Sequence, residues 1–301
     1  MINKLIAATL PHMPKKLVWL FSKRYIAGET IEDAVNASKK LNAEGIKVTV
    51  DLLGEFIKDL SQATENKEAY LNIIETFESN KIDGNYSVKP TFFGLLIDEE
   101  ICYENIRTIV AKAAEYNNFV RVDMEDSPCV DKEIKIFRRL KAEFPNNVGL
   151  VVQAYLKRTQ SDLENMMNMQ NGTSNLNYRL CKGIYVEPKE IAFKRYEEIN
   201  SNYLKNLEFL LENKVFPGIA THDKNLVGPA MELIEKHKVS KDMYEFQMLY
   251  GVTPELRKSI LKKGHNMRVY VPFGKDWFGY STRRLKENPK MASLIMRPLK
   301  K

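Results

Sequence analysis

The sequence has few cysteines, few histidines and no long apolar segment. Its 301 residues include three cysteines, at positions 102, 129 and 181, and four histidines. An odd number of cysteines without paired spacing argues against a disulfide framework and indicates a reducing compartment such as the cytoplasm. No apolar run approaches the roughly 18–20 residues that cross a bilayer. The histidines never lie at metal-ligand spacing from each other or from a cysteine, so we expect no metal site.

The sequence also has no known nucleic-acid-binding motif and no densely basic helix. Lysine and arginine nevertheless outnumber the acidic residues, which gives a net charge of +7. This charge fits an anionic cofactor, an anionic substrate or an anionic membrane surface, and it fits general solubility equally well. We therefore expect no nucleic-acid partner. At 44% hydrophobic residues, the chain can bury a large core.

Eight short apolar runs, rich in β-branched and aromatic residues, alternate with longer charged segments. A strand followed by a helix, repeated eight times, predicts an α/β protein with a (β/α)8 barrel of the TIM type. In that fold the loops after the strands build the active site. The runs cover residues 46–55, 86–95, 119–126, 148–156, 178–185, 216–223, 243–250 and 267–274.

Two helical segments precede the first run. Residues 30–44 begin at Thr30, a preferred N-cap residue, and end before Gly45, a common helix stop. We predict that residues 1–44 pack on the outside of a catalytic barrel formed by residues 45–301. A basic amphipathic helix can also contact a membrane surface, and this alternative stays open for residues 14–27. That segment has an apolar stripe formed by Leu17, Leu20, Phe21 and Tyr25.

Several runs contain charged residues that are costly to bury without a partner. Arg179 and Lys182 lie in the fifth run, and Gly183 would let a ligand approach the backbone, which suits an anion such as a pyrophosphate. His222 has no Gly-x-Ser-x-Gly nucleophile elbow to act with. Asp123 precedes other acidic residues, but without nearby histidines a salt bridge is favoured over a metal site.

The segment after the last run predicts a helix over 277–288. Arg283 and Arg284 lie side by side on it and could bind one carboxylate from two directions. Spacing alone leaves open an exposed salt bridge between Arg283 and Glu287.

Ordered blocks of sequence, one for almost every predicted strand, carry a family resemblance. They read SVK at 87–89, RVDME at 121–125, VQAY at 152–155, RLCKGIY at 179–185, ATHD at 220–223, EFQMLYG at 245–251 and RVYVP at 268–272, followed by Arg283, Arg284 and Glu287. Together they resemble the proline dehydrogenase family, the flavin-dependent barrel enzymes of proline catabolism. The length resembles the compact bacterial single-function members.

The resemblance implies FAD-dependent oxidation of L-proline to Δ1-pyrroline-5-carboxylate, the first step of proline degradation to glutamate. Electrons would pass to a quinone-type acceptor, and the cytoplasmic enzyme would contact the inner face of the plasma membrane transiently. Two alternatives are another barrel enzyme, such as a metal- or phosphate-dependent lyase, and a non-catalytic barrel scaffold. The missing histidine clusters argue against the first, and the charged residues at strand ends argue against the second.

The resemblance also implies residue roles. The implied catalytic residues are Asp123, Arg179 and Tyr270. The implied proline-binding residues are Lys89, Leu180, Tyr185, Tyr270, Tyr280, Arg283 and Arg284. The implied FAD-binding residues are Met124, Gln153, Arg179, Lys182, Gly183, Ile184, Thr221, His222, Gln247 and Glu287. Glu55 would hold Arg284, whereas Pro90, Ile184 and Val186 depart from the family pattern.

Overall fold

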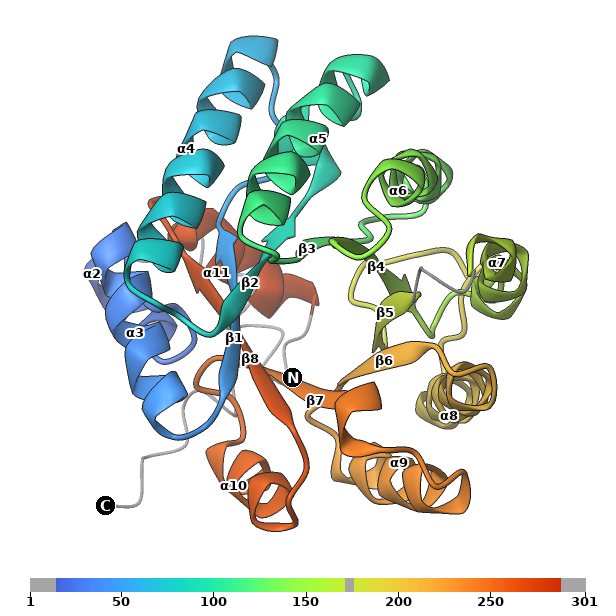
Figure 1. Ribbon diagram of the computed structural model, residues 1–301. Helices are drawn as coiled ribbons and strands as arrows, with labels where there is room; N and C mark the ends of the chain where they lie inside the picture. The colour runs from blue at the N-terminus through green and yellow to red at the C-terminus, as the bar shows by residue number, and fades with distance from the viewer. Residues whose placement is uncertain (1–14, 171–175, 288–301) are drawn as a thin grey trace.

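The computed structural model describes residues 15–170 and 176–287, and within them the side chains of residues 16, 17, 20, 21 and 283–287 are not described. Eight parallel strands close into a barrel in sequence order, with β8 paired to β1 (Figure 1). This closure confirms the predicted fold. The strands are β1 (Lys47–Leu52), β2 (Gly84–Val88), β3 (Val120–Val122), β4 (Val148–Gln153), β5 (Asn177–Cys181), β6 (Phe216–Ala220), β7 (Glu245–Leu249) and β8 (Met267–Phe273).

Helices surround the strands (Figure 1). Those that follow β1 are α4 (Leu60–Ser79), α5 (Glu99–Glu115), α6 (Val130–Glu143), α7 (Thr159–Met166), α8 (Tyr196–Glu212), α9 (Lys224–Lys236), α10 (Pro254–Lys262) and α11 (Trp277–Glu287). Short 3-10 turns are η2 (Pro90–Phe93), η3 (Met167–Met169) and η4 (Lys241–Met243).

Two described helices precede the barrel, α2 (Lys15–Ser22) and α3 (Ile31–Ala43). Thr30 caps α3 as predicted: its hydroxyl accepts from the backbone N–H of Asp33 at 3.2 Å, and Asp33 returns the bond. In α2, Trp19 packs on Trp277 of α11 with ring centroids 4.7 Å apart. Of the predicted stripe, Tyr25 is buried, and the other three side chains lie outside the description. The division of the chain at residue 44 stays a prediction, because residues 1–14 are also not described.

Most strands end several residues before the predicted runs do. β2 stops at Val88 because Pro90 has no N–H for the ladder and starts the turn η2 instead. β5 stops at Cys181, and Gly183 then adopts a φ of +101°. After β5 an irregular loop leads to α8, which begins only at Tyr196. Many candidate site residues therefore lie at the carboxyl end of a strand or in the loop just after it.

Polar side chains fill the barrel interior near the amino-terminal ends of the strands. Barrels of this fold usually have branched apolar residues in the interior. Arg121 is 1% exposed. Its guanidinium donates to the backbone and side-chain oxygens of Asn177 at 2.8 and 2.6 Å and stacks 4.9 Å from the Phe119 ring centroid. Arg268 donates to Glu245 at 2.6 Å. These pairs tie β3 to β5 and β8 to β7 through the interior.

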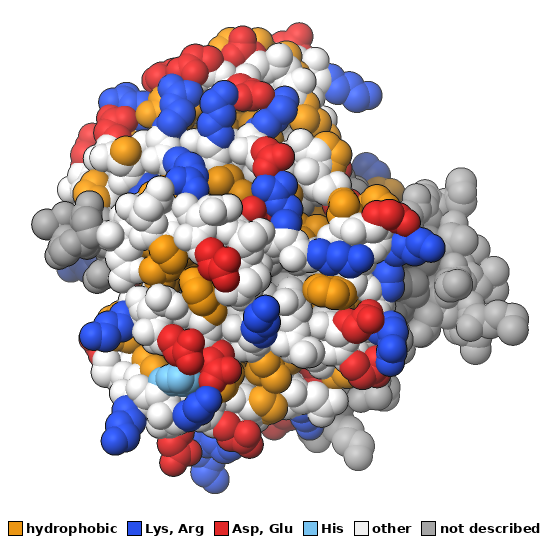
Figure 2. Space-filling model, turned by 90° about the vertical axis from the view of Figure 1, so that its right-hand side faces the viewer, with side chains coloured by type: hydrophobic (Ala, Val, Ile, Leu, Met, Phe, Trp, Pro, Cys, Tyr) orange, Lys and Arg blue, Asp and Glu red, His pale blue; other side chains and the backbone are white. Residues whose placement is uncertain are grey.

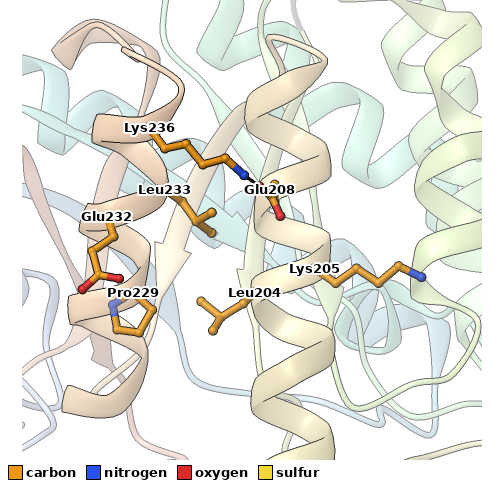
Figure 3. A pocket seen from close by; sticks show the side chains of 7 residues that line it. All are labelled: Leu204, Lys205, Glu208, Pro229, Glu232, Leu233 and Lys236. Atoms are coloured by element: carbon orange, nitrogen blue, oxygen red, sulfur yellow. Dashed lines mark hydrogen bonds and ion pairs between the residues drawn. The ribbon is translucent and has the colours of Figure 1, made fainter.

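A shallow groove of about 500 Å³ lies outside the barrel, between α8 and α9 (Figure 3). Lys236 and His237 both contact Glu208 beside this groove, at 2.5 and 3.2 Å. Glu208, Glu212 and His237 each have a potential ligand atom, and these three atoms lie within 4.8 Å of one another. No predicted site residue lines this groove. On the face shown in Figure 2, acidic and basic side chains are interspersed over the surface. Exposed ion pairs of this kind contribute little to stability.

Replacing Gly149 by alanine tests how tightly the interior is filled. An added Cβ would lie 2.5 Å from the Asn177 oxygen and 2.6 Å from Arg121. We expect the free energy of unfolding to fall by about 1–3 kcal/mol in denaturant titrations. The control is Gly228→Ala in α9, where nothing lies within 4 Å and helix propensity should raise stability by up to about 1 kcal/mol. Equal effects of the two substitutions would contradict the packing argument.

Candidate active site

Lys89 lies at the carboxyl end of β2 and joins three strands. Its ammonium contacts Asp51 at 3.0 Å, Asp123 at 3.1 Å and the Tyr270 hydroxyl at 3.0 Å. Burial opposes the charged form of Lys89, but Asp51 and the other nearby groups outweigh it and raise its pKa well above the usual value. Lys89 therefore stays a cation at neutral pH.

Asp123 accepts bonds from four neighbouring groups. Arg179 donates to it at 3.0 Å and Ser87 at 2.6 Å, on the oxygen opposite the one that binds Lys89 and Tyr270. Burial favours the neutral acid, but the charges of Lys89 and Arg179 and these hydrogen bonds lower the pKa of Asp123 below its usual value. The structure thus brings together all three implied catalytic residues and Lys89.

Arg179 is fixed on two sides. Its Nε donates to Gln247 at 2.7 Å, and its Nη1 contacts Asp123 and Ser87. Gln247 in turn donates to Glu245 at 2.7 Å, which connects this site to the polar interior below it. Such a network leaves the guanidinium few alternative orientations.

Sequence reasoning missed Asp51, although it contacts Lys89 directly. Its side chain is 1% exposed, and burial raises its pKa to about 6 against the attraction of Lys89. Its Oδ2 accepts no hydrogen bond. An aspartate inside an apolar strand was the available signal, because such a residue needs a buried partner.

Further predicted residues lie at the ends of β4 to β6. Lys182 contacts Asp223 at 2.5 Å and lies over the Tyr196 ring, 4.5 Å from its centroid. Asp223, which the prediction did not include, also caps α9 by accepting from the Asn225 N–H. Because Asp223 is the N-cap residue of α9, the Lys182 side chain is held beside the start of that helix. Asp223 could have been anticipated from its place in the block ATHD.

His222 and Gln153 have defined roles in hydrogen bonding. His222 Nε2 accepts from the Leu249 N–H at 2.8 Å, so the neutral ring carries its proton on Nδ1. Gln153 donates to the backbone oxygen of Glu125 at 2.8 Å. With Arg179 and Lys182, they place two cations, an amide and an imidazole on one side of the barrel, a donor set that fits a planar ligand with an anionic tail.

The other predicted residues are placed as follows. Met124, Leu180 and Thr221 are buried, and Leu180 packs within the main apolar core. Ile184 and Tyr185 are partly buried, and burial raises the pKa of Tyr185 above its usual value. Tyr280 is 7% exposed beside Trp277. The backbone of Arg283, Arg284 and Glu287 belongs to α11, but their side chains lie outside the described residues.

Several known proteins are similar to this chain over most of its length. The family model described as proline dehydrogenase matches residues 34–297. Proline dehydrogenase 1 of Bacillus subtilis (strain 168) is 36% identical over 94% of this chain and 91% of its own length. The proline dehydrogenase of Deinococcus radiodurans is 34% identical over 96% and 93%. This chain belongs to the proline dehydrogenase family. The membership confirms the predicted family and its enzyme class.

The solved structures extend the comparison to larger members. Proline utilization A (PutA) from Bdellovibrio bacteriovorus, inactivated by N-propargylglycine, matches with a TM-score of 0.83 at 27% identity. The match covers 89% of this chain and 33% of that chain, so the present chain spans about a third of the PutA length. Among the described residues, no helix is both long enough and apolar enough to span a bilayer.

Glu125, another buried acid that the sequence reasoning missed, follows Asp123 of the candidate site by two residues. Its carboxylate accepts from the Thr91 N–H at 2.9 Å and the Thr91 hydroxyl at 2.6 Å, and its own N–H donates to Glu133 at 3.0 Å. Burial raises the pKa of Glu125 to about 7 and that of Glu133 well above its usual value. The position was missed because Glu125 follows Asp123 in a short acidic run.

Glu125 should make stability depend on pH. Between pH 4.5 and about 7 the folded chain holds a proton that the unfolded chain has lost, so stability falls as pH rises through this range. Glu125→Gln should make this fall less steep, by up to about 3 kcal/mol, in urea titrations at several pH values. The exposed Glu235→Gln serves as control and should keep the wild-type slope. An unchanged slope in Glu125→Gln would show that this residue titrates normally.

Proposed function

We propose that this chain catalyses the FAD-dependent oxidation of L-proline to Δ1-pyrroline-5-carboxylate. This reaction is the first step of proline degradation to glutamate, and a quinone-type acceptor would take the electrons. The observation that carries the proposal is the fixed set of Lys89, Asp123, Arg179 and Tyr270 at the barrel mouth, in a chain of this family. We also propose a cytoplasmic location with transient contact at the inner face of the plasma membrane.

The proline carboxylate would bind Lys89 together with Arg283 and Arg284. The three protons of the Lys89 ammonium are all engaged, by Asp51, Asp123 and Tyr270. A substrate carboxylate would therefore take the place of the Tyr270 oxygen. The Tyr270 hydroxyl can give up this bond because it still donates to Asp123 at 3.1 Å.

The ring of proline would lie against Tyr270. The Arg179 guanidinium lies 5.0 Å from the centroid of the Tyr270 ring. The substrate and the guanidinium would therefore lie close together, both beside Tyr270. Tyr185, Tyr280 and Leu180 would complete the apolar wall. Holding the ring from several sides gives the proximity effect that transfer of hydrogen requires.

FAD, when bound, would accept a hydride equivalent from C5 of proline, and the protein would supply binding and electrostatics. Arg179 would lie near the flavin N5, with Gln153 and Met124 along the ring system. Lys182, Gly183 and Ile184 would follow the pyrophosphate and ribityl chain, with Thr221 and His222 beside them. Gln247 and Glu287 are further proposed contacts. The paired cations at the end of β5 support these assignments, since they can stabilise negative charge on the cofactor.

The amine of proline must lose its proton before hydrogen transfer. Burial raises the pKa of Tyr270, and nearby acids raise that of Lys89, so both side chains keep their protons at neutral pH. Asp123 is ionised but has four hydrogen-bond donors around it. We therefore propose that the amine loses its proton to water.

The absorption spectrum of the purified protein tests the function first. Bands near the usual flavin positions, bleached by L-proline without oxygen and restored by a short-chain quinone, would support cofactor, substrate and acceptor together. A flavin spectrum that proline leaves unchanged would contradict the substrate assignment. Failure to take up FAD on reconstitution would overturn the proposal.

Replacing Lys89 by methionine should raise the KM for proline by roughly 10- to 150-fold, because one charge-assisted contact is lost. Steady-state kinetics, with flavin content measured on the same samples, would detect the change. Lys39→Met is the control: Lys39 lies on α3, where its ammonium donates to Asn80 at 2.8 Å. An unchanged KM in Lys89→Met would remove Lys89 from the carboxylate site.

A further inference from the structure

A buried chain of hydrogen bonds runs from α6 to the loop that follows β1. Glu133 accepts from the Glu125 N–H, and the Glu125 carboxylate accepts both donors of Thr91. Thr91 in turn accepts from the loop: its hydroxyl bonds the Phe56 N–H at 3.1 Å, and its backbone oxygen bonds the Ile57 N–H at 3.4 Å. Glu125, Glu133 and Thr91 are each at most 1% exposed.

The loop at 53–59 has a conformation that needs such support. Phe56 has a φ of +52°, in the left-handed region that bulky residues rarely adopt, and its side chain is 37% exposed. Two residues earlier, a Cβ on Gly54 would lie 2.0 Å from the Phe92 ring, so the backbone passes directly over η2. Strained backbone of this kind persists only where the surroundings fix it, and it often lies at functional sites.

Thr91 follows Lys89 by two residues and so connects the loop to the end of β2, where the proposed substrate pocket lies. Glu55 precedes Phe56, and its charge contributes to the raised pKa of Lys89. Burial is the main cause of the raised pKa of Tyr185, to which Glu125 and Glu55 both add. One loop residue, Glu55, thus acts electrostatically on two of the proposed proline-binding residues.

We propose that Thr91, held by Glu125, is a positioning residue that fixes the loop 53–59 and thereby sets the affinity for proline. The inference rests on the proposed function for its substrate. Thr91 uses every bonding group it has: hydroxyl and N–H donate to Glu125, while hydroxyl and carbonyl oxygens accept from the loop. No other side chain joins Glu125 to this loop among the described hydrogen bonds.

Thr91→Val tests the proposal, because valine keeps the shape and loses the hydroxyl. We expect the KM for proline to rise roughly 5- to 100-fold with kcat nearly unchanged, since groups that contact the reacting atoms stay in place. Thr91→Ser should restore KM to near the wild-type value. The amide protons of Phe56 and Ile57 should exchange with solvent faster in Thr91→Val and normally in Thr91→Ser.

The matched control is Thr49→Val. Thr49 is also fully buried, and its hydroxyl contacts Asn85 at 2.5 Å near the opposite end of the barrel. It should lose stability while keeping the wild-type KM and normal exchange at Phe56. An equal rise of KM in Thr49→Val, or failure of serine to rescue, would overturn the positioning role.

The exchange measurement needs no substrate and separates the two proposals. If the wild type does not oxidise proline, the proposed function fails. If exchange at Phe56 and Ile57 is the same in wild type and Thr91→Val, the positioning role fails whatever the substrate is.

Discussion

The need to pair buried charges constrains this barrel more than any other interaction. Removing a charge from water is costly unless an opposite charge or several hydrogen bonds replace the solvent. Three ion pairs or groups of ion pairs meet this need inside the barrel: Lys89 with Asp51 and Asp123, Arg179 with Asp123, and Arg268 with Glu245. Arg121 relies instead on the neutral oxygens of Asn177.

Pairing also explains how the strands position the site. Asp123, which follows β3, contacts Lys89 just after β2, Arg179 on β5 and Tyr270 on β8. Each contact requires its two strands to keep their register, because a shift by one residue would turn the side chain to the other face. The polar interior therefore gives specificity of register in addition to whatever stability it contributes. The loop after β1 is also held by a buried acid, because Thr91 connects it to Glu125.

Much of the fold could be predicted because the apolar runs recur in order and most contain a polar or charged residue near the carboxyl end. The boundaries could not, since Pro90 and the positive φ of Gly183 end strands whose sequence still has β-type composition. Lys89, Asp123 and Arg179 were found from the family blocks. Asp51 and Glu125 were missed because a run of sequence can show that a buried acid needs a partner, but it does not show which residues the other strands bring close.

The closure of the barrel has a consequence for biosynthesis. β1 pairs with β8, and α2 packs on α11, so segments more than 200 residues apart must meet. A ribosome adding roughly 5–20 residues per second needs on the order of 10–45 s to make the intervening chain. For most of that time Lys89 lacks Tyr270. The nascent chain must keep such incompletely paired charges in water until β8 has been synthesised. Synthesis of this last strand is therefore the step that allows the site to close.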